Sequence, residues 1–345
     1  MRYRQCGPRS KIRFRRRSML GRYKKAVVTG GCGFIGSHLV DSLVSLGKEV
    51  VVFDNLSTGL VTNVAAGAQL IEGDVRNPEQ VARALRDADL VFHVAGNSNT
   101  TRSVNDPRLD YESNSQGCLN ILQAALHAHV EKIVFVSSAS VYGTPQSFPI
   151  CEDHPTSPFV PYGVSKLAGE TFCRSFFETY ETPVVIVRPF CVYGPRENPE
   201  VGLVEVSRYM RWHLNDRPIQ VVGDPDQKSR DFVHVSDVVR GLILLADRGV
   251  VGEVYNLGSG DEVTMRQLTV AIGAVDGGPA SMKPLRHITD DTYRLVSDIT
   301  KARSHGYTPK MSLKEGLIRL MQHLGPQPVL PAGATIFKRD QQAEI

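Results

Sequence analysis

The sequence predicts an α/β fold built on a doubly wound parallel sheet, and two observations lead to this prediction. The glycine-rich stretch 29–36 stands between the apolar run 26–28 and an amphipathic run that ends at Leu46, which is typical of a strand, a tight turn and a helix. From there to residue 187, apolar runs alternate with helix-like stretches. Buried strands separated by helices form parallel sheets with both faces covered.

The individual elements follow this alternation. Strands are predicted at 26–28, 49–54, 69–74, 89–96, 132–137 and 183–187, and helices at 35–46, 78–86, 106–129 and 162–179. Beyond Gly194 prolines interrupt the pattern, and only 231–235 and 254–257 look like further strands of the sheet. Helices at 236–247, 265–275 and 313–324 complete a second, smaller α/β lobe. We expect the cleft at the carboxyl ends of the strands.

The glycines of the first turn predict a dinucleotide site. Gly30 permits the sharp turn, Gly33 lets backbone N–H groups approach a pyrophosphate, and Gly36 lets the helix lie close to the strand. The unpaired N–H groups and the positive end of the helix would face the phosphates. The glycine spacing alone is equally compatible with an ordinary strand–turn–helix.

An aspartate at the end of the next strand favours NAD. Asp54 follows the β-branched run 49–53, about 20 residues beyond the glycines. A carboxylate there can accept hydrogen bonds from the adenosine ribose diol and would repel a 2′-phosphate. The predicted cofactor is therefore NAD rather than NADP.

Three residues form a candidate catalytic unit. Tyr162 and Lys166 lie four apart at a helix start, so both face one side of that helix. We expect the lysine ammonium to favour the phenolate of a buried tyrosine, which would prepare it for proton transfer at neutral pH. Ser138, at the end of the preceding strand, could hold a substrate oxygen beside the tyrosine. Without its context, Tyr-x-x-x-Lys is also a common surface pair.

Ordered motifs along the chain extend this pattern, namely 29–37, 54–59, 73–75, 138–143, 162–166, 188–190, 192–196 and 230–235. Together they resemble the extended short-chain dehydrogenase/reductase family, in its NAD-dependent nucleotide-sugar epimerase/dehydratase branch. The likeness spans about residues 24 to 325. It implies a tightly held NAD, a UDP-sugar substrate, and a homodimer formed through the helices around 106–129 and 162–180.

The resemblance also implies the site residues. Those toward the cofactor are Gly30, Gly33, Phe34, Ile35, Gly36, Asp54, Asn55, Ser57, Thr58, Gly59, Asp74, Val75, Val94, Ala95, Gly96, Asn114, Ser137, Tyr162, Lys166 and Pro189. Those toward the substrate are Ser138, Ser140, Tyr162, Phe190, Cys191, Leu203, Val204, Gln220, Val222, Arg230 and Arg294. In this scheme Asp74 and Val75 flank the adenine, and Asn114 lines the nicotinamide side. Arg230 and Arg294 clamp the diphosphate, for which guanidinium groups are suited.

The residues after Ser138 narrow the reaction. At the positions that begin with Ser138, dehydrating members of the family have a sequence like Thr-Asp-Glu. Decarboxylating members have a Glu two residues before the Tyr of the Val-Tyr-Gly motif (141–143). This chain has Ala139 and Ser140 instead, and no carboxylate. Proton transfer and NAD redox chemistry suffice for 4-epimerisation through a 4-keto sugar. We favour UDP-glucose and UDP-galactose over UDP-glucuronate and UDP-galacturonate, although the loop 192–200 is similar to that of UDP-glucuronate 4-epimerases.

Two departures from the family pattern bear on the substrate. Cys191 stands where UDP-glucose/galactose epimerases usually have Asn, and Asn97-Ser98-Asn99 differs from the commoner sequence. Alternatives are another NDP-sugar-modifying dehydrogenase, reductase or dehydratase, and a non-catalytic NAD-binding scaffold. An intact set of Ser138, Tyr162 and Lys166 argues against a scaffold.

Charge is concentrated at the start of the chain. The formal net charge is +4, but the first 25 residues hold eleven of the 40 basic residues and no acidic ones. The rest of the chain has 29 basic and 36 acidic residues, a net charge of −7. This negative charge does not favour binding to nucleic acid. The basic segment at the start of the chain could also be a tail that binds nucleic acid or a membrane surface, or a targeting segment. We expect a disordered extension, with Met19 as the natural start.

The predicted organisation has four parts: a basic extension (1–23), a Rossmann-type NAD-binding domain (24–190 plus 230–258), a nucleotide-sugar-binding lobe (191–229 plus 259–325) and a flexible tail (326–345). The six cysteines form no Cys-x-x-Cys pair and no metal spacing, so we predict no metal site and free thiols in the cytoplasm. No apolar stretch approaches the ~18 residues of a membrane span, and no membrane partner is expected.

Overall fold

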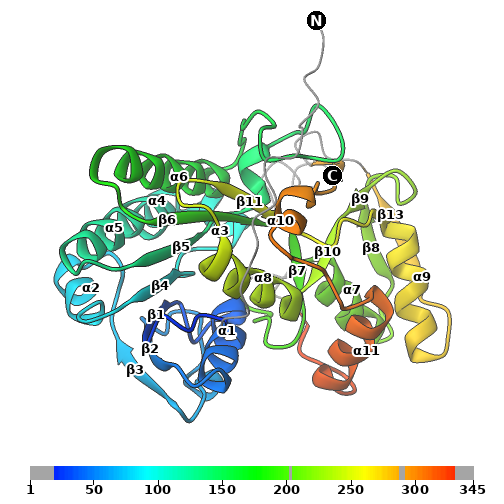
Figure 1. The fold of residues 1–345 in the computed structure, drawn as a ribbon. Coiled ribbons are helices and arrows are strands. Elements are labelled where there is room, and N and C mark those ends of the chain that lie inside the picture. The colour runs from blue at the N-terminus through cyan, green and yellow to red at the C-terminus, as the bar shows by residue number, and fades with distance from the viewer. Residues whose placement is uncertain (1–18, 202–203, 287–291, 331–345) are drawn as a thin grey trace, which may run out of the picture.

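A seven-stranded parallel sheet forms the centre of the computed structural model, which describes residues 19–201, 204–286 and 292–330 (Figure 1). The strand order is β11-β6-β5-β4-β1-β2-β3, and every pair of neighbours is parallel. The strands are β1 (Lys25–Thr29), β2 (Glu49–Asp54), β3 (Ala68–Glu72), β4 (Leu90–His93), β5 (Lys132–Val136), β6 (Val184–Pro189) and β11 (Val254–Leu257). This arrangement confirms the predicted doubly wound α/β fold.

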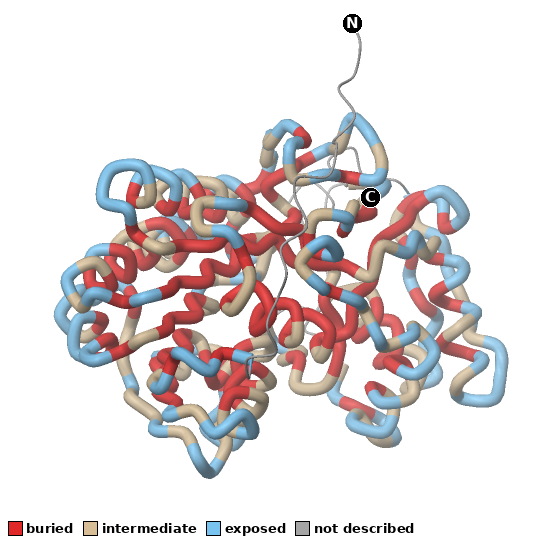
Figure 2. Tube along the Cα trace, in the orientation of Figure 1, coloured by how far each residue is buried: buried red, intermediate tan, exposed pale blue. Residues whose placement is uncertain are grey.

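Helices cover both faces of this sheet. Alternate residues such as Val28 and Val52 point to α1 (Phe34–Ser45) and α8 (Val235–Arg248). Their neighbours Val27 and Val51 lie in the opposite core, which contains residues of α2 (Pro78–Ala84), α5 (Gly117–His127) and α6 (Pro161–Tyr180). Because both faces are covered, β4, β5, β6 and β11 are buried along their whole length (Figure 2).

The predicted helix 106–129 consists of several pieces. It begins as α4 (Pro107–Tyr111), passes through the π-helical segment η2 (Glu112–Gln116) and continues as α5, and the short α3 (Thr100–Asn105) precedes it. π-Helical turns are rare and often mark functional sites. Asn114, predicted at the nicotinamide side, lies in this segment.

The chain changes its strand partner after β6. Phe190 N still donates to Leu257 O of β11, but Cys191 N donates to Asp231 O. From there β7 (Cys191–Tyr193) pairs with β10 (Phe232–His234) in a separate two-stranded sheet. The prediction of 231–235 as a strand of the main sheet is therefore wrong. Only residues 232–234 pair, and they pair with β7. Val233 packs into the core of the main sheet, whereas Phe232 packs into the core of the second group of elements.

A second group of elements surrounds a core that includes Tyr193, Met210, Phe232, Leu268 and Leu317. These elements are α7 (Glu205–His213), β8 (Ile219–Val222), β9 (Ser229–Arg230), β12 (Val263–Thr264), α9 (Met265–Asp276), β13 (Met282–Leu285), β14 (Arg294–Leu295) and α11 (Leu313–Leu324). The short α10 (Thr300–Ser304) packs against β11, and its Ala302 lies in the core of the main sheet. Strand β9 lies between β12 and β14, and β13 pairs with β8. The three helices predicted beyond residue 235 are found within one or two residues of their predicted bounds.

Both ends of the described chain pack against the fold. Leu20 and Tyr23 are buried in the core with α1 and α8, so the predicted boundary of the basic extension at residue 23 falls inside a packed segment. At the other end, Val329 O accepts a hydrogen bond from Arg211 and Pro328 O accepts one from Asn215. These contacts contradict a wholly unstructured tail from 326, whereas 331–345 and 1–18 lie outside the described residues.

No helix in the described ranges is long and apolar enough to cross a membrane.

Candidate active site

The glycine turn after β1 has the backbone geometry that its sequence predicts. Gly30 has φ +70°, and a Cβ on it would lie 2.8 Å from the backbone of Ala95. A Cβ on Gly36 would lie 2.1 Å from Gly30 O, so only glycine lets α1 approach the turn this closely. Gly33 precedes α1 without a side-chain cap, which leaves the helix N-terminus open to an anion.

Asp54 ties the glycine turn to the end of β2. Its Oδ2 accepts a hydrogen bond from Cys32 N at 2.9 Å, and its Oδ1 accepts one from Leu56 N at 2.9 Å. The carboxylate therefore holds two loops together at the place predicted for the adenosine ribose. Gly59 closes the second loop against the turn, because a Cβ on it would lie 2.7 Å from Cys32 Cβ.

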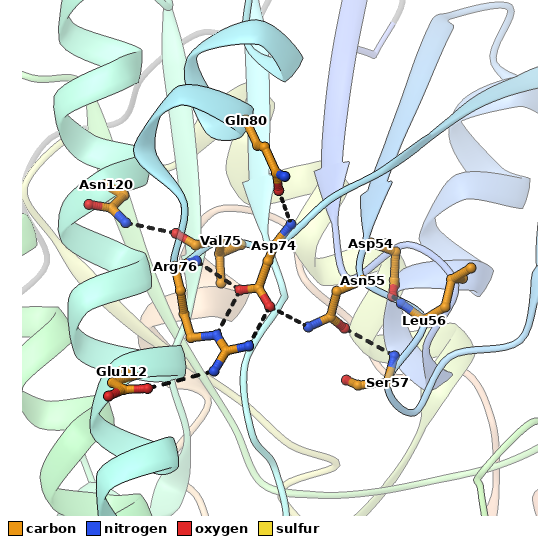
Figure 3. Close-up of polar contacts among 10 residues, drawn as sticks. All are labelled: Asp54, Asn55, Leu56, Ser57, Asp74, Val75, Arg76, Gln80, Glu112 and Asn120. Atoms are coloured by element: carbon orange, nitrogen blue, oxygen red, sulfur yellow. Dashed lines mark hydrogen bonds and ion pairs between the residues drawn. The ribbon is translucent and has the colours of Figure 1, made fainter.

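A polar network lies at the end of β3, where the adenine was predicted (Figure 3). Asp74 accepts hydrogen bonds from Asn55 Nδ2 at 2.9 Å and from Arg76 Nη2 at 2.7 Å. Arg76 in turn pairs with Glu112 of η2 at 3.6 Å. Burial would raise the pKa of Asp74, but the Arg76 and Asn55 contacts outweigh it and lower the pKa to about 2. Beside this network is an open hollow of about 560 Å³, lined in part by Gln116.

The other predicted cofactor residues meet at the same edge of the sheet. Phe34 and Ile35 begin α1, Asn55–Gly59 follow β2, Val94–Gly96 follow β4, Ser137 follows β5, and Pro189 ends β6. Val75 is buried, and its carbonyl oxygen accepts a hydrogen bond from Asn120. The structure thus brings the predicted set together at the carboxyl ends of six parallel strands, which is where this fold binds ligands.

Ser138, Tyr162 and Lys166 also gather at this edge. Lys166 Nζ donates to Val136 O at 3.0 Å, and Tyr162 and Ser138 share a hydrogen bond. Ser138 Oγ also donates to Ser140 Oγ at 3.1 Å. The end of β5 and the start of α6 therefore place a hydroxyl, a phenol and an ammonium group side by side.

The electrostatics of the tyrosine differ from the expectation. Burial raises the pKa of Tyr162, the Ser138 hydrogen bond opposes this, and the Asp110 carboxylate adds to it. The Lys166 ammonium is directed at Val136 O, and burial lowers its own pKa to about 8. Stabilisation of the phenolate by this lysine stays a prediction.

A buried ion pair underlies these residues and was not predicted. Glu170, on α6 one turn beyond Lys166, accepts hydrogen bonds from Arg188 at 2.8 and 2.6 Å and from Ser137 Oγ at 2.6 Å. Arg188 is 1 % exposed and lies over the Tyr142 ring. Because Val136 contacts Lys166 and Ser137 contacts Glu170, the end of β5 is joined to α6 at two successive turns. The only sequence signal was a Glu four residues beyond Lys166.

The structure does not bring together the side chains of Arg230 and Arg294, the predicted diphosphate clamp. Arg230 on β9 is buried, with Nε 3.4 Å from Glu205. Arg294 on β14 is exposed and pairs with both oxygens of Glu262 at 2.7 and 2.6 Å. The register aligns Arg294 with Ser229 rather than with Arg230, so the two side chains leave opposite faces of the small sheet.

The remaining substrate residues lie around this lobe. Phe190 is buried beside Tyr142, and Cys191 lies at the start of β7, where burial raises the pKa of its thiol. Val204 precedes α7, and Gln220 and Val222 are on β8, with Gln220 exposed. Leu203 lies outside the described residues.

The turn after β7 contacts the cofactor side of the molecule. His38 of α1 bonds Pro195 O through Nε2 at 3.0 Å, and Arg196 pairs with Asp41 at 2.8 Å. Asn198 Nδ2 donates to Thr58 O, in the loop that follows β2, at 3.0 Å. We name residues 194–198 the bridging turn, since they join the second group of elements to the predicted cofactor loop.

The residues fit a dinucleotide. The glycine turn leaves room that any Cβ would fill, α1 presents an uncapped N-terminus, and a carboxylate ends β2. At the far end of this edge, Asn114 Oδ1 is buried without a donor. Among the described residues no group of three or more His, Cys, Asp or Glu side chains could hold a metal ion.

Comparisons with known proteins agree with this geometry. Residues 26–258 match the NAD dependent epimerase/dehydratase family. UDP-glucose 4-epimerase of Mycolicibacterium smegmatis is 33 % identical over 308 residues, which cover 86 % of this chain and 97 % of that protein. The structure of UDP-glucose 4-epimerase from Thermotoga maritima with UDP-glucose superposes with a TM-score of 0.83 at 33 % identity, covering 87 % of this chain and 98 % of that one.

A dehydratase is similar to a comparable degree. The structure of dTDP-glucose 4,6-dehydratase from Streptomyces venezuelae with NAD bound has a TM-score of 0.79 at 32 % identity, covering 86 % of this chain and 95 % of the other. The matched family, the shared fold and the site residues agree on NAD as the cofactor. The chain belongs to the NAD-dependent epimerase/dehydratase family of nucleotide-sugar enzymes, within the extended short-chain dehydrogenases/reductases.

Proposed function

We propose that this enzyme is a UDP-sugar 4-epimerase, which interconverts C4 epimers through a transient 4-keto sugar. The observation that carries the proposal is the composition of the site around Ser138. Ser138, Tyr162 and Lys166 meet beside the dinucleotide loops, whereas Ala139 and Ser140 occupy the positions after Ser138 and supply no carboxylate. The site holds what reversible oxidation at C4 needs and lacks the acid–base groups that dehydration would require there.

Each residue has a role in this reaction. Tyr162, in its phenolate form, accepts the proton of the C4 hydroxyl and returns it after the 4-keto ring has turned about its diphosphate link. Ser138, which already shares a hydrogen bond with Tyr162, donates to the sugar oxygen. Lys166 contributes a positive charge and holds the nicotinamide ribose. Bound NAD supplies reversible oxidation and reduction at C4.

The nucleotide end would be held by the second group of elements. Both arginines of the predicted pair have partners, Glu205 and Ser229 O for Arg230 and Glu262 for Arg294, but Arg230 is buried whereas Arg294 is exposed. We propose Arg230 as the main diphosphate ligand. We retain the division of the chain into a lobe made of 191–229 and 259–325 and an NAD domain made of 24–190 and 230–258. In this division β10 belongs to the NAD domain and pairs with β7 of the lobe.

We also propose a homodimer through α4, α5 and α6. Tyr111, Val164 and Tyr180, which belong to α4 and α6, are each more than half exposed. Apolar side chains on adjacent helices are suited to an isologous contact between two copies. Light scattering of the purified protein, with a charge introduced at Val164, would measure the association.

One experiment tests the reaction and the sugar together. Purified protein without added NAD is incubated with UDP-glucose and, separately, with UDP-glucuronate, and the C4 proton is followed by NMR. Conversion of one sugar to its C4 epimer supports the proposal and identifies the substrate. Tyr162→Phe should abolish conversion, whereas Tyr180→Phe, at the exposed end of the same helix, should leave it unchanged.

The opposite result is equally informative. Protein that retains NAD but converts neither nucleotide sugar would contradict 4-epimerisation of these substrates. Release of water from a nucleotide hexose would point to a dehydratase. A requirement for added NAD, with net oxidation or reduction of the sugar, would point to a dehydrogenase or reductase.

A further inference from the structure

A buried aspartate faces the catalytic residues from the helix opposite α6. Asp110 on α4 is 1 % exposed, and its Oδ1 accepts hydrogen bonds from Asn97 Nδ2 at 2.7 Å and Asn114 Nδ2 at 3.1 Å. Its Oδ2 is buried and has no donor among the described residues. Asn97 belongs to the segment 97–99, which departs from the commoner family sequence. In the structure its side chain donates to Asp110.

The neighbours of Asn114 determine how its amide is turned. Besides Asp110, the Asn114 NH2 group donates to Asn97 O at 3.0 Å and to Ser165 Oγ at 2.9 Å. A carboxylate and a carbonyl can only accept, so the nitrogen must be on this side. The Asn114 oxygen is consequently turned the other way, where it is buried without a donor.

That oxygen faces the reacting groups. A Cβ built on Gly96 would lie 2.2 Å from Asn114 Oδ1 and 3.5 Å from Lys166 Nζ, so both atoms border the same space above Gly96. The π-helical segment η2 displaces Asn114 from an ordinary helical position and directs it there. The aspartate thus acts on this space through the asparagine amide.

We propose that Asp110 is a positioning residue of the active site, which orients the Asn114 amide toward Lys166 and places a fixed negative charge beside the Tyr162–Lys166 pair. This inference rests on the proposed function of these residues in proton transfer. In this inference Asn97 holds the Asp110 carboxylate in place. The role in the active site also gives a reason for burying this charge between two neutral amides, those of Asn97 and Asn114.

The charge has a predictable effect on both catalytic groups. Burial is the main reason that the pKa of Tyr162 is raised, and Asp110 raises it further. At Lys166, whose pKa burial lowers, Asp110 opposes the lowering. The other ionisable groups that act on Lys166 or respond to it are Cys118 on α5, Glu170 and Cys173 on α6, and His93 on β4. Loss of the Asp110 charge should therefore lower the pKa of both Tyr162 and Lys166.

The test compares Asp110→Asn with Asp106→Asn. The first removes the buried charge at nearly constant shape; the second makes the same change at the exposed N-cap of α4, where Asn serves equally well. Both limbs of the pH profile of kcat should move to lower pH in Asp110→Asn, by about half a unit to one unit. Asp110→Leu, which also removes the acceptor, should lower kcat by at least about tenfold with little change in KM.

A second readout does not depend on turnover. Ultraviolet titration of tyrosine ionisation, taken as the difference between proteins with Tyr162 and with Tyr162→Phe, reports the pKa of this phenol directly. It should fall in Asp110→Asn and stay constant in Asp106→Asn. If neither UDP-sugar is epimerised by the wild type, the proposed function fails, and this titration still decides the role of Asp110. A Tyr162 pKa unchanged by Asp110→Asn, or a loss of thermal stability alone, would overturn the inference.

Discussion

The cofactor edge of the main sheet and the substrate lobe are built by different means. Around the glycine turn, short-range backbone geometry determines the site: the φ of Gly30, the close approach of Gly36 to it, and the end of a long parallel strand. In the lobe, strands of two to four residues hold side chains whose partners come from distant segments, such as Arg294 with Glu262. The backbone geometry of the turn requires glycines at fixed spacing, which is visible in the sequence. Ion pairs between distant segments leave no such local pattern.

The largest contrast should be between the buried and the exposed ion pair. Glu170→Gln leaves the Arg188 guanidinium buried without its counter-charge, so we expect a loss of about 3–4 kcal/mol in the free energy of unfolding. Glu262→Gln breaks a pair at the surface of the lobe and should cost less than about 1 kcal/mol. Denaturant titration of both variants measures this. Equal losses would show that the two regions do not differ in this respect.

A glycine substitution sharpens the contrast at the level of the backbone. In Gly36→Ala the new methyl group would meet Gly30 O, so the turn must shift, at a cost of about 2 kcal/mol in stability together with loss of bound NAD. Gly278→Ala, where the added Cβ meets no atom within 4 Å, is the matched change in the lobe and should be nearly neutral. Thermal unfolding and the cofactor content after gel filtration are the measurements. Full NAD retention by Gly36→Ala would contradict the role of this close approach.

The two arginines of the lobe should differ in their effect on substrate binding. We expect Arg230→Met to raise KM for the nucleotide sugar by about tenfold or more, because a buried guanidinium would make strong charge-assisted bonds to the diphosphate if it is the proposed ligand. Arg294→Met should change KM by less than about threefold, since Glu262 already satisfies Arg294. Initial rates at several substrate concentrations separate the two. The reverse order would restore the predicted role of Arg294.

The smallest expected effect is the pH-dependent contribution of Asp74, at the predicted adenine site, to stability. The pKa of Asp74 is lowered to about 2 in the folded chain, so its contribution to stability is present at neutral pH and is lost as the pH falls from about 4 toward 2. Asp74→Asn should therefore be slightly less stable than the wild type at pH 7, by less than about 1 kcal/mol, because the carboxylate is partly exposed to solvent. The difference should shrink at acid pH. Thermal unfolding at both pH values tests this.

Sequence reasoning reached the fold and the cofactor edge because their signals are periodic or local. The alternating apolar runs predicted six of the seven strands of the main sheet in the first 190 residues and the seventh at 254–257, and the glycine spacing predicted the turn. It failed for 231–235, whose three paired residues are too few to show which sheet they join. Asp110 and Glu170 were missed because each is recognised only by partners on other elements, Asn97 and Arg188 respectively. The pairing of Arg294 with Glu262 was missed for the same reason.

The bridging turn has a consequence for the lifetimes of the two ligands. Because Asn198 holds the carbonyl of Thr58, and Arg196 holds α1 through Asp41, the bridging turn restrains a loop on the predicted cofactor side. A nucleotide sugar that orders the turn should therefore slow the departure of NAD, whereas its own release need not open the glycine loop. Such an arrangement lets substrate exchange many times during one residence of the cofactor, which is what an enzyme that regenerates its cofactor in every cycle requires.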